Sequence, residues 1–180
     1  MNHSPSRRRA LLALGALVLP PPSRAQPDPW QPLRPLVGEW SGTSTGRPGE
    51  ATVTRSYAFV LGGRYLHETS VSVYAPQERN KTGERHEHWG MFSFDGTRKT
   101  LVLRHFHIES FVNTYRHAVV EGRPQLVVFE SESFENFSNS WKARETYEFI
   151  NPDEFVETFE LAAPWKEYEV YSRATLKRQP

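Results

Sequence analysis

The 180-residue sequence contains no cysteine, which excludes disulfide bonds, thiol catalysis and cysteine-based zinc sites. Its formal net charge is +1 at pH 7, so the overall charge gives no reason to expect a nucleic-acid partner or an anionic membrane. The sequence also lacks a nucleophile elbow, a glycine-rich phosphate loop and a His-Glu-x-x-His motif. Because these enzyme motifs are missing, we expect a binding protein rather than an enzyme.

The first 25 residues predict a signal peptide. Residues 7–9 are three arginines, residues 10–19 form a short apolar run, and residues 23–25 resemble a cleavage site. The run is too short to span a bilayer, so we expect no integral membrane segment after cleavage. The mature protein is expected to be periplasmic or secreted, through either the general secretory or the twin-arginine route. Residues 26–35 are rich in proline and predict a linker.

Residues 36–180 predict one all-β domain. They form about ten short stretches of alternating apolar and polar residues. Turn sequences such as Gly62-Gly63 and Asp95-Gly96 separate these stretches. The pattern predicts a closed antiparallel β-barrel, with a short helical turn before the first strand. Aromatic residues make up 13% of the chain, enough to fill part of a barrel, and small barrels usually hold a small ligand.

Alternation along each expected strand predicts which side chains face the interior. In residues 51–60 the apolar positions share a face with Arg55, and in residues 141–150 they share a face with Glu145. In residues 64–74 the odd positions are mostly apolar and include His67. In the hairpin of residues 86–108 both faces are partly apolar, and we expect the Trp89 face inside because histidines on the other face tolerate water better. The candidate ligand-binding residues are Arg55, His67, Trp89, Arg104, Phe106, Glu145 and Tyr147.

The expected interior contains charged groups that need partners. Arg55, Arg104, Glu145 and Glu157 are costly inside a barrel unless they are paired, solvated or in contact with a ligand. One interpretation is a small, largely apolar ligand with an acidic or polar head on Arg55 or Arg104. The other is a structural network in which arginine and glutamate offset one another inside a filled barrel.

Four histidines lie on one face of the expected hairpin. His86 and His88 share a face of one strand, and His105 and His107 share the same face of its partner. Cross-strand neighbours lie close enough to share a metal ion, and imidazole suits zinc, copper or nickel. The sequence therefore offers a candidate metal site, most simply for zinc. The alternative is a solvated face that titrates near neutral pH.

The segment Leu36-Val37-Gly38-Glu39-Trp40-Ser41-Gly42 resembles the opening of the calycins, the group of lipocalins, fatty-acid-binding proteins and nitrobindins. The resemblance covers residues 33–178 and is strongest to exported bacterial proteins with a nitrobindin-like barrel. It implies a closed barrel with an internal cavity and with Trp40 closing one end.

The resemblance also implies a possible cofactor, haem. Nitrobindins bind haem through a histidine on the last strand, and residues 171–178 are similar to that strand. The matching position holds Tyr171, and tyrosine can also ligate haem iron. The predicted function is an exported, non-enzymatic barrel that binds a small, largely apolar molecule and needs no cofactor. A haem- or metal-binding barrel is the alternative.

Overall fold

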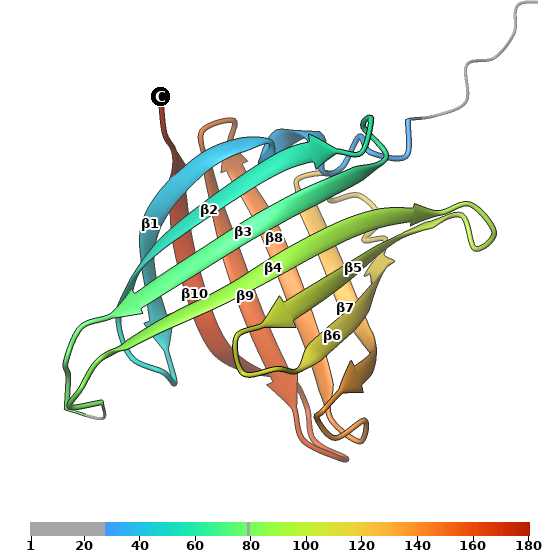
Figure 1. Ribbon diagram of the computed structural model, residues 1–180. Coiled ribbons are helices and arrows are strands. Elements are labelled where there is room, and N and C mark those ends of the chain that lie inside the picture. The colour runs from blue at the N-terminus through green and yellow to red at the C-terminus, as the bar shows by residue number, and fades with distance from the viewer. Residues whose placement is uncertain (1–27, 79) are drawn as a thin grey trace, which may run out of the picture.

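The computed structural model describes residues 28–78 and 80–180. In these residues the chain forms a closed antiparallel barrel of ten strands, which confirms the predicted fold class (Figure 1). Each strand pairs with the next along the chain, and the first pairs with the last. The predicted signal peptide, residues 1–25, lies outside the described residues.

A single 3-10 turn, η1 (Arg34–Leu36), precedes the barrel. The strands are β1 (Gly38–Gly46), β2 (Ala51–Val60), β3 (Tyr65–Tyr74), β4 (Glu84–Asp95), β5 (Thr100–His107), β6 (Val112–Ala118), β7 (Leu126–Glu135), β8 (Lys142–Asn151), β9 (Glu154–Ala162) and β10 (Glu169–Arg178). In the part of the chain that is described, no helical segment has the length and apolar character needed to cross a membrane.

Local sequence explains the hairpins and the closure of the barrel. At the predicted Asp95-Gly96 turn, the Asp95 carboxylate accepts hydrogen bonds from the backbone N–H groups of Thr97 and Arg98, at 2.9 and 3.0 Å. Where β1 meets β10, a Cβ on Gly42 would lie 1.8 Å from the carbonyl oxygen of Thr175. The first and last strands can therefore approach only because this position is glycine.

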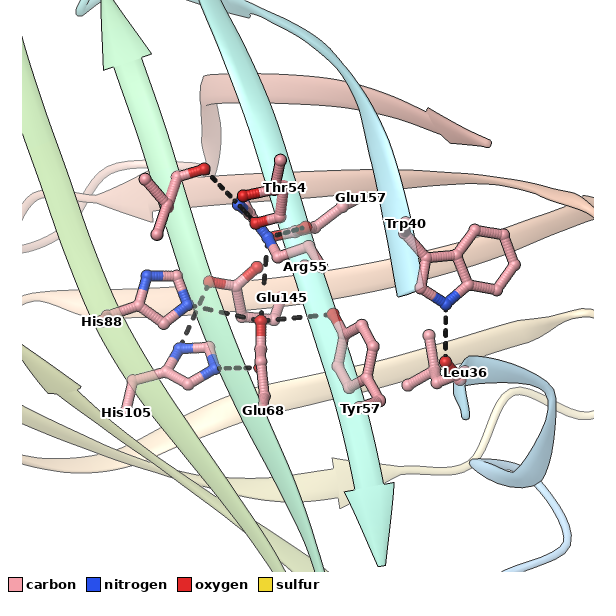
Figure 2. Close-up of polar contacts among 11 residues, drawn as sticks. Leu36, Trp40, Thr54, Arg55, Tyr57, Glu68, His88, His105, Glu145 and Glu157 are labelled. Atoms are coloured by element: carbon pink, nitrogen blue, oxygen red, sulfur yellow. Dashed lines mark hydrogen bonds and ion pairs between the residues drawn. The ribbon is translucent and has the colours of Figure 1, made fainter. Parts of the chain in front are cut away.

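Trp40 and η1 close one end of the barrel. The Trp40 side chain is 1% exposed, and its Nε1 donates to the carbonyl oxygen of Leu36 at 2.6 Å (Figure 2). Its ring packs edge-on against Phe155, at 4.7 Å between ring centroids, and the Arg178 guanidinium lies over the ring, 4.2 Å from its centroid. Below this plug, the first half of the barrel is filled with buried apolar and aromatic side chains: Tyr57, Leu66, Phe92, Leu103, Phe129, Tyr147 and Phe155.

Candidate ligand-binding cavity

The other half of the barrel contains a cavity of about 1030 Å³. Its walls come from the strand ends farthest from Trp40, and its mouth is surrounded by the five loops at that end. Each of these loops contributes to the lining, through Pro48, Asn80, Glu109, Phe137 and Lys166. The N-terminal segment that precedes β1 lies at the top of Figure 1, and the five loops that surround the mouth lie at the bottom.

One side of the cavity is aromatic. Phe137, from the loop between β7 and β8, lies 5.6 Å from Phe134, 6.0 Å from Trp141 and 6.2 Å from Phe111, measured between ring centroids. Phe159 of β9 continues this wall. These rings offer a broad apolar surface to a molecule in the cavity.

The cavity ends on a layer of buried polar side chains, here called the floor. Arg55, His88, Glu145 and Glu157 of this layer line the cavity, and Glu68 lies fully buried among them (Figure 2). Tyr57 Oη donates to Glu68 Oε1 at 3.2 Å, and Nε2 of His105 lies 3.3 Å from Oε2. His88 Nε2 and Arg55 Nε lie 3.4 and 3.7 Å from Oε1. Burial alone would raise the pKa of Glu68, but the close imidazoles of His105 and His88 together favour its charged form and lower the pKa well below its usual value. Glu68 is therefore held as a carboxylate.

A glycine leaves room for the Glu68 side chain to reach its central position. Gly90 of β4 lies between Glu68 of β3 and His105 of β5, because it is the cross-strand partner of both. A Cβ on Gly90 would lie 2.4 Å from Glu68 Oε2. The missing side chain thus lets Glu68 lean across β4 and reach His105.

Arg55 is already paired inside the barrel. Its Nε donates to Glu157 Oε2 at 3.0 Å and its Nη2 to Glu157 Oε1 at 3.4 Å. Its Nη1 donates to the carbonyl oxygens of Thr54 and Val71 at 3.1 and 3.4 Å. Burial alone would lower the pKa of Arg55, but the nearby charge of Glu157 helps to raise it overall, so the guanidinium stays charged. This side chain therefore has little capacity left for a ligand anion.

Glu145 differs from the other buried carboxyl groups. Burial raises its pKa well above the usual value, and the charges of Glu157 and Glu68 raise it further. Its Oε2 has no hydrogen-bond partner within residues 28–78 and 80–180, and its Oε1 lies 3.8 Å from His105 Nδ1. The environment thus favours a protonated Glu145, which can donate as well as accept.

The structure brings the four hairpin histidines together. The ring centroids of His88 and His105 are 4.6 Å apart, those of His88 and His107 are 5.2 Å apart, and those of His86 and His107 are 5.6 Å apart. Burial lowers the pKa of His88 to about 3 and that of His107 to about 2, so both imidazoles are uncharged at neutral pH. Metal binding by this group stays a prediction.

The expected orientation of the β4–β5 hairpin is wrong. Trp89 is 62% exposed, Phe106 is 47% exposed, and Arg104 lies on the same outer face. The histidine face is inside because the imidazoles have polar partners there, above all Glu68. Since this part of the interior is polar, the more apolar face of the hairpin does not have to point inward. Outside, Trp89 packs edge-on against His67, at 5.5 Å between ring centroids.

The expected orientation of β3 is also wrong, which removes His67 from the interior. Leu66, Glu68, Ser70 and Ser72 are buried, whereas the odd positions are less so. Sequence reasoning therefore missed Glu68, the centre of the floor. The signal that was missed is the register between β2 and β3. With a four-residue connection over 61–64, Ser70 pairs with Arg55. Because cross-strand partners share a face, an inward Arg55 places Ser70, and with it Glu68, inside.

The inward orientation expected for β2, β8 and β9 is confirmed. Arg55, Glu145, Tyr147 and Glu157 are all buried. Arg55, Glu145 and Glu157 line the cavity, whereas Tyr147 belongs to the packed half beneath it. Whether any of these residues binds a ligand stays a prediction.

Tyr171, the candidate haem ligand, lies at the cavity mouth. The register of β10 against β9 shifts between Val170 and Ser172, and this bulge turns Tyr171 toward the lining, where it packs edge-on against Phe159. The mouth also contains Glu84, Glu109, Glu167 and Glu169, with Arg47 and Lys166 as cations. Haem carries two propionates, so this charge distribution does not favour it, and haem binding through Tyr171 stays a prediction.

Comparison with known proteins gives a fold and no function. No protein-family profile matches the sequence, and no curated protein matches it. The structure is similar to the crystal structure of Rv2717c from M. tuberculosis, with a TM-score of 0.59 and 19% identity over 87% of this chain and 100% of that chain. A redesigned β-barrel has a TM-score of 0.43 and 12% identity over 81% of this chain and 93% of its own. A protein of unknown function from Nostoc punctiforme has a TM-score of 0.31 and 7% identity over 86% of this chain and 100% of its own.

At these identities, the likeness to Rv2717c concerns the fold alone. The chain is a closed ten-stranded antiparallel barrel with the same overall fold as Rv2717c.

Proposed function

We propose that this barrel binds a small, largely apolar molecule in its interior cavity, without a catalytic step. The observation that supports the proposal is the cavity itself, which has a volume of about 1030 Å³, an aromatic wall and a polar floor. Small-molecule sites typically have about 300–1000 Å³ and an apolar lining with a few placed polar groups. A barrel that served only as a packed structural module would not need this space.

The body of the ligand would lie against the aromatic wall. Phe111, Phe134, Phe137, Trp141 and Phe159 face the cavity from the side formed by β6 to β9. Apolar surface buried there contributes roughly 25 cal/mol per Å² to binding. A flat or chain-like apolar molecule fits this wall better than a strongly polar one.

The head of the ligand would reach the floor, and its charge can be inferred from the groups there. An acidic head was one expectation from the sequence, but Arg104 lies outside and Arg55 is paired with Glu157. Glu145 and Glu157 line the cavity, so an added carboxylate would meet like charge or a proton donor rather than a free cation. We therefore favour an uncharged head that exchanges hydrogen bonds with Glu145.

The proposal also places the protein in the periplasm or outside the cell, because of the export signal predicted in residues 1–25. Mass spectrometry of the exported fraction should find an N-terminus near Gln26. A mature protein that retains Met1 would contradict export by cleavage.

A neutral, environment-sensitive dye such as Nile red tests binding in the cavity. Ala174 is 4% exposed and lines the cavity, whereas the next residue, Thr175, is exposed on the outer face. Ala174→Phe should weaken dye binding by about tenfold or more because the phenyl ring takes up ligand space, and Thr175→Phe should not.

Two results would contradict the proposal. The first is the absence of saturable dye binding to the wild type. The second is equal binding by the two phenylalanine variants together with loss in Trp89→Ala, because Trp89 lies on the outer face and its loss should leave the cavity intact.

A further inference from the structure

We propose that His86, His88 and His107 form a binding site for one divalent transition-metal ion, best suited to zinc, in the wall of the cavity. Each of the three offers a ring nitrogen, and these nitrogens all lie within 4.8 Å of one another. All three residues line the cavity. The site does not depend on the proposed function, because it needs no organic ligand.

The strand pairing explains why three rings converge. His86 and His88 are two residues apart on β4 and therefore point to the same side of the sheet. His107 of β5 is the direct cross-strand partner of His88. Neighbouring positions of this kind hold their Cβ atoms about 4.5–5.5 Å apart, which is close enough for imidazoles to share one ion.

Each ring has a polar side chain near one of its two nitrogens. His86 Nδ1 lies 2.8 Å from Glu109 Oε1, and His88 Nε2 lies 3.4 Å from Glu68 Oε1. His107 Nε2 lies 3.2 Å from the Asn113 amide. Histidine ligands of metals almost always have such an outer partner, which fixes the tautomer and the ring orientation.

The buried ring of His88 gives independent support. Its side chain is 9% exposed, and neither of its nitrogens makes a hydrogen bond of good geometry with the described part of the chain. His107 Nδ1 is likewise buried without such a partner. Polar atoms in this state are costly, and a metal ion would engage both rings at once.

A deeper group, formed by Glu68, His88 and His105, competes for the same imidazole. Glu68 and His105 do not line the cavity, and Glu68 already accepts a hydrogen bond from Tyr57 and lies near Arg55. An ion entering from the mouth meets the outer group first. The outer group also provides three nitrogen ligands and leaves a fourth position toward the cavity, the ligand number of open zinc sites.

Zinc titration of metal-free protein, purified without a histidine tag, tests the site. Isothermal calorimetry should give one zinc ion per chain, and cobalt(II) should give the visible absorption of a four-coordinate site. His86→Ala and His107→Gln should each weaken zinc by about 100-fold or more, and Glu109→Gln by about 10–100-fold. His67→Ala is the matched control, because this half-buried histidine lies on the outer face, and it should bind zinc like the wild type.

The variants separate the outer group from the deeper one. His105→Gln should keep most zinc affinity, since His105 is not a ligand in the proposed site. Loss of zinc in His105→Gln with retention in His86→Ala and His107→Gln would overturn the proposal in favour of the deeper group. The absence of stoichiometric zinc in the wild type would overturn it outright. Urea unfolding of the same samples shows that each variant is folded, and Nile red binding reports on the cavity separately.

Discussion

Replacing Glu145 by glutamine should stabilise the barrel at neutral pH, although this side chain belongs to the buried polar layer. Glu145 is 5% exposed, and its Oε2 has no hydrogen-bond partner in the described structure. Burial, followed by the charges of Glu157 and Glu68, raises the pKa of this carboxyl well above its usual value. Glutamine has nearly the shape of a protonated glutamate and cannot ionise.

The size of the effect follows from proton linkage. An unfolded glutamate has a pKa of about 4.3, so above that pH the unfolded wild type loses a proton that the folded protein keeps. The free energy of unfolding of the wild type therefore falls relative to that of Glu145→Gln by up to about 1.4 kcal/mol for each pH unit. This fall continues until the pH reaches the folded pKa of Glu145. Below about pH 4 both states are protonated, and the two proteins should be equally stable to first order.

Urea unfolding at a series of pH values from 4 to 8 measures this difference. The control is Glu148→Gln, on the same strand, whose carboxylate forms an ion pair with Arg123 near the surface. Such pairs are worth about 0–1 kcal/mol, so the control should follow the wild-type profile with a small constant offset. Parallel pH profiles for Glu145→Gln and the wild type would refute the reasoning, because they would mean that Glu145 ionises as readily in the folded protein as in the unfolded chain.

Four further substitutions test how the barrel is held together, each by urea unfolding. Arg55→Met should cost about 3–5 kcal/mol because it leaves the Glu157 carboxylate buried without its partner. Arg104→Met should change stability by less than about 0.5 kcal/mol because this side chain is exposed, and a large loss there would contradict the observed orientation of β5. Gly90→Ala should cost about 1–3 kcal/mol because its Cβ would push against Glu68, and an unchanged stability would show that Glu68 does not need this space. Trp40→Ala should cost about 3–5 kcal/mol by removing the plug, and a small effect would mean that η1 closes the barrel alone.

The fold could be predicted from the sequence because the patterns that indicate its strands and turns each lie within a short stretch of the chain. The Asp95-Gly96 turn, the Gly-x-Trp opening at Trp40 and the alternation along each strand depend on residues close together in the chain. An antiparallel barrel in which each strand pairs with the next needs little more than these signals. The closure of β1 against β10, made possible by Gly42, is the one long-range pairing that local rules do not define.

The site was predicted only in part, because apolar residues are a poor guide to the inside of a barrel with a polar interior. On β2 and β8 the apolar positions share a face with Arg55 and Glu145, and the prediction of the inner face was correct. On β4 the inner face carries His88, whereas Trp89 lies outside, so hydrophobicity alone selected the wrong face. Tracing cross-strand partners outward from Arg55 would have placed Ser70, and then Glu68, inside.

The same tracing explains how the histidines come to face the cavity. Ser70 pairs with His88, and His88 pairs with His107, so one inward position on β2 fixes inward positions on three further strands. The hydrogen bonds between side chains depend on distances that no sequence pattern contains. The pairing of Arg55 with Glu157, at 3.0 Å, joins residues that are 102 positions apart.

Native mass spectrometry of the protein isolated from its own cells, without denaturation, tests the central claim most directly. The account predicts a mass above that of the bare chain, owing to a retained small molecule. That added mass should be lost in Ala174→Phe and kept in Thr175→Phe, which differ only in whether the new ring points into the cavity. A bare chain mass for the wild type and both variants, together with no saturable uptake of Nile red, would contradict the account.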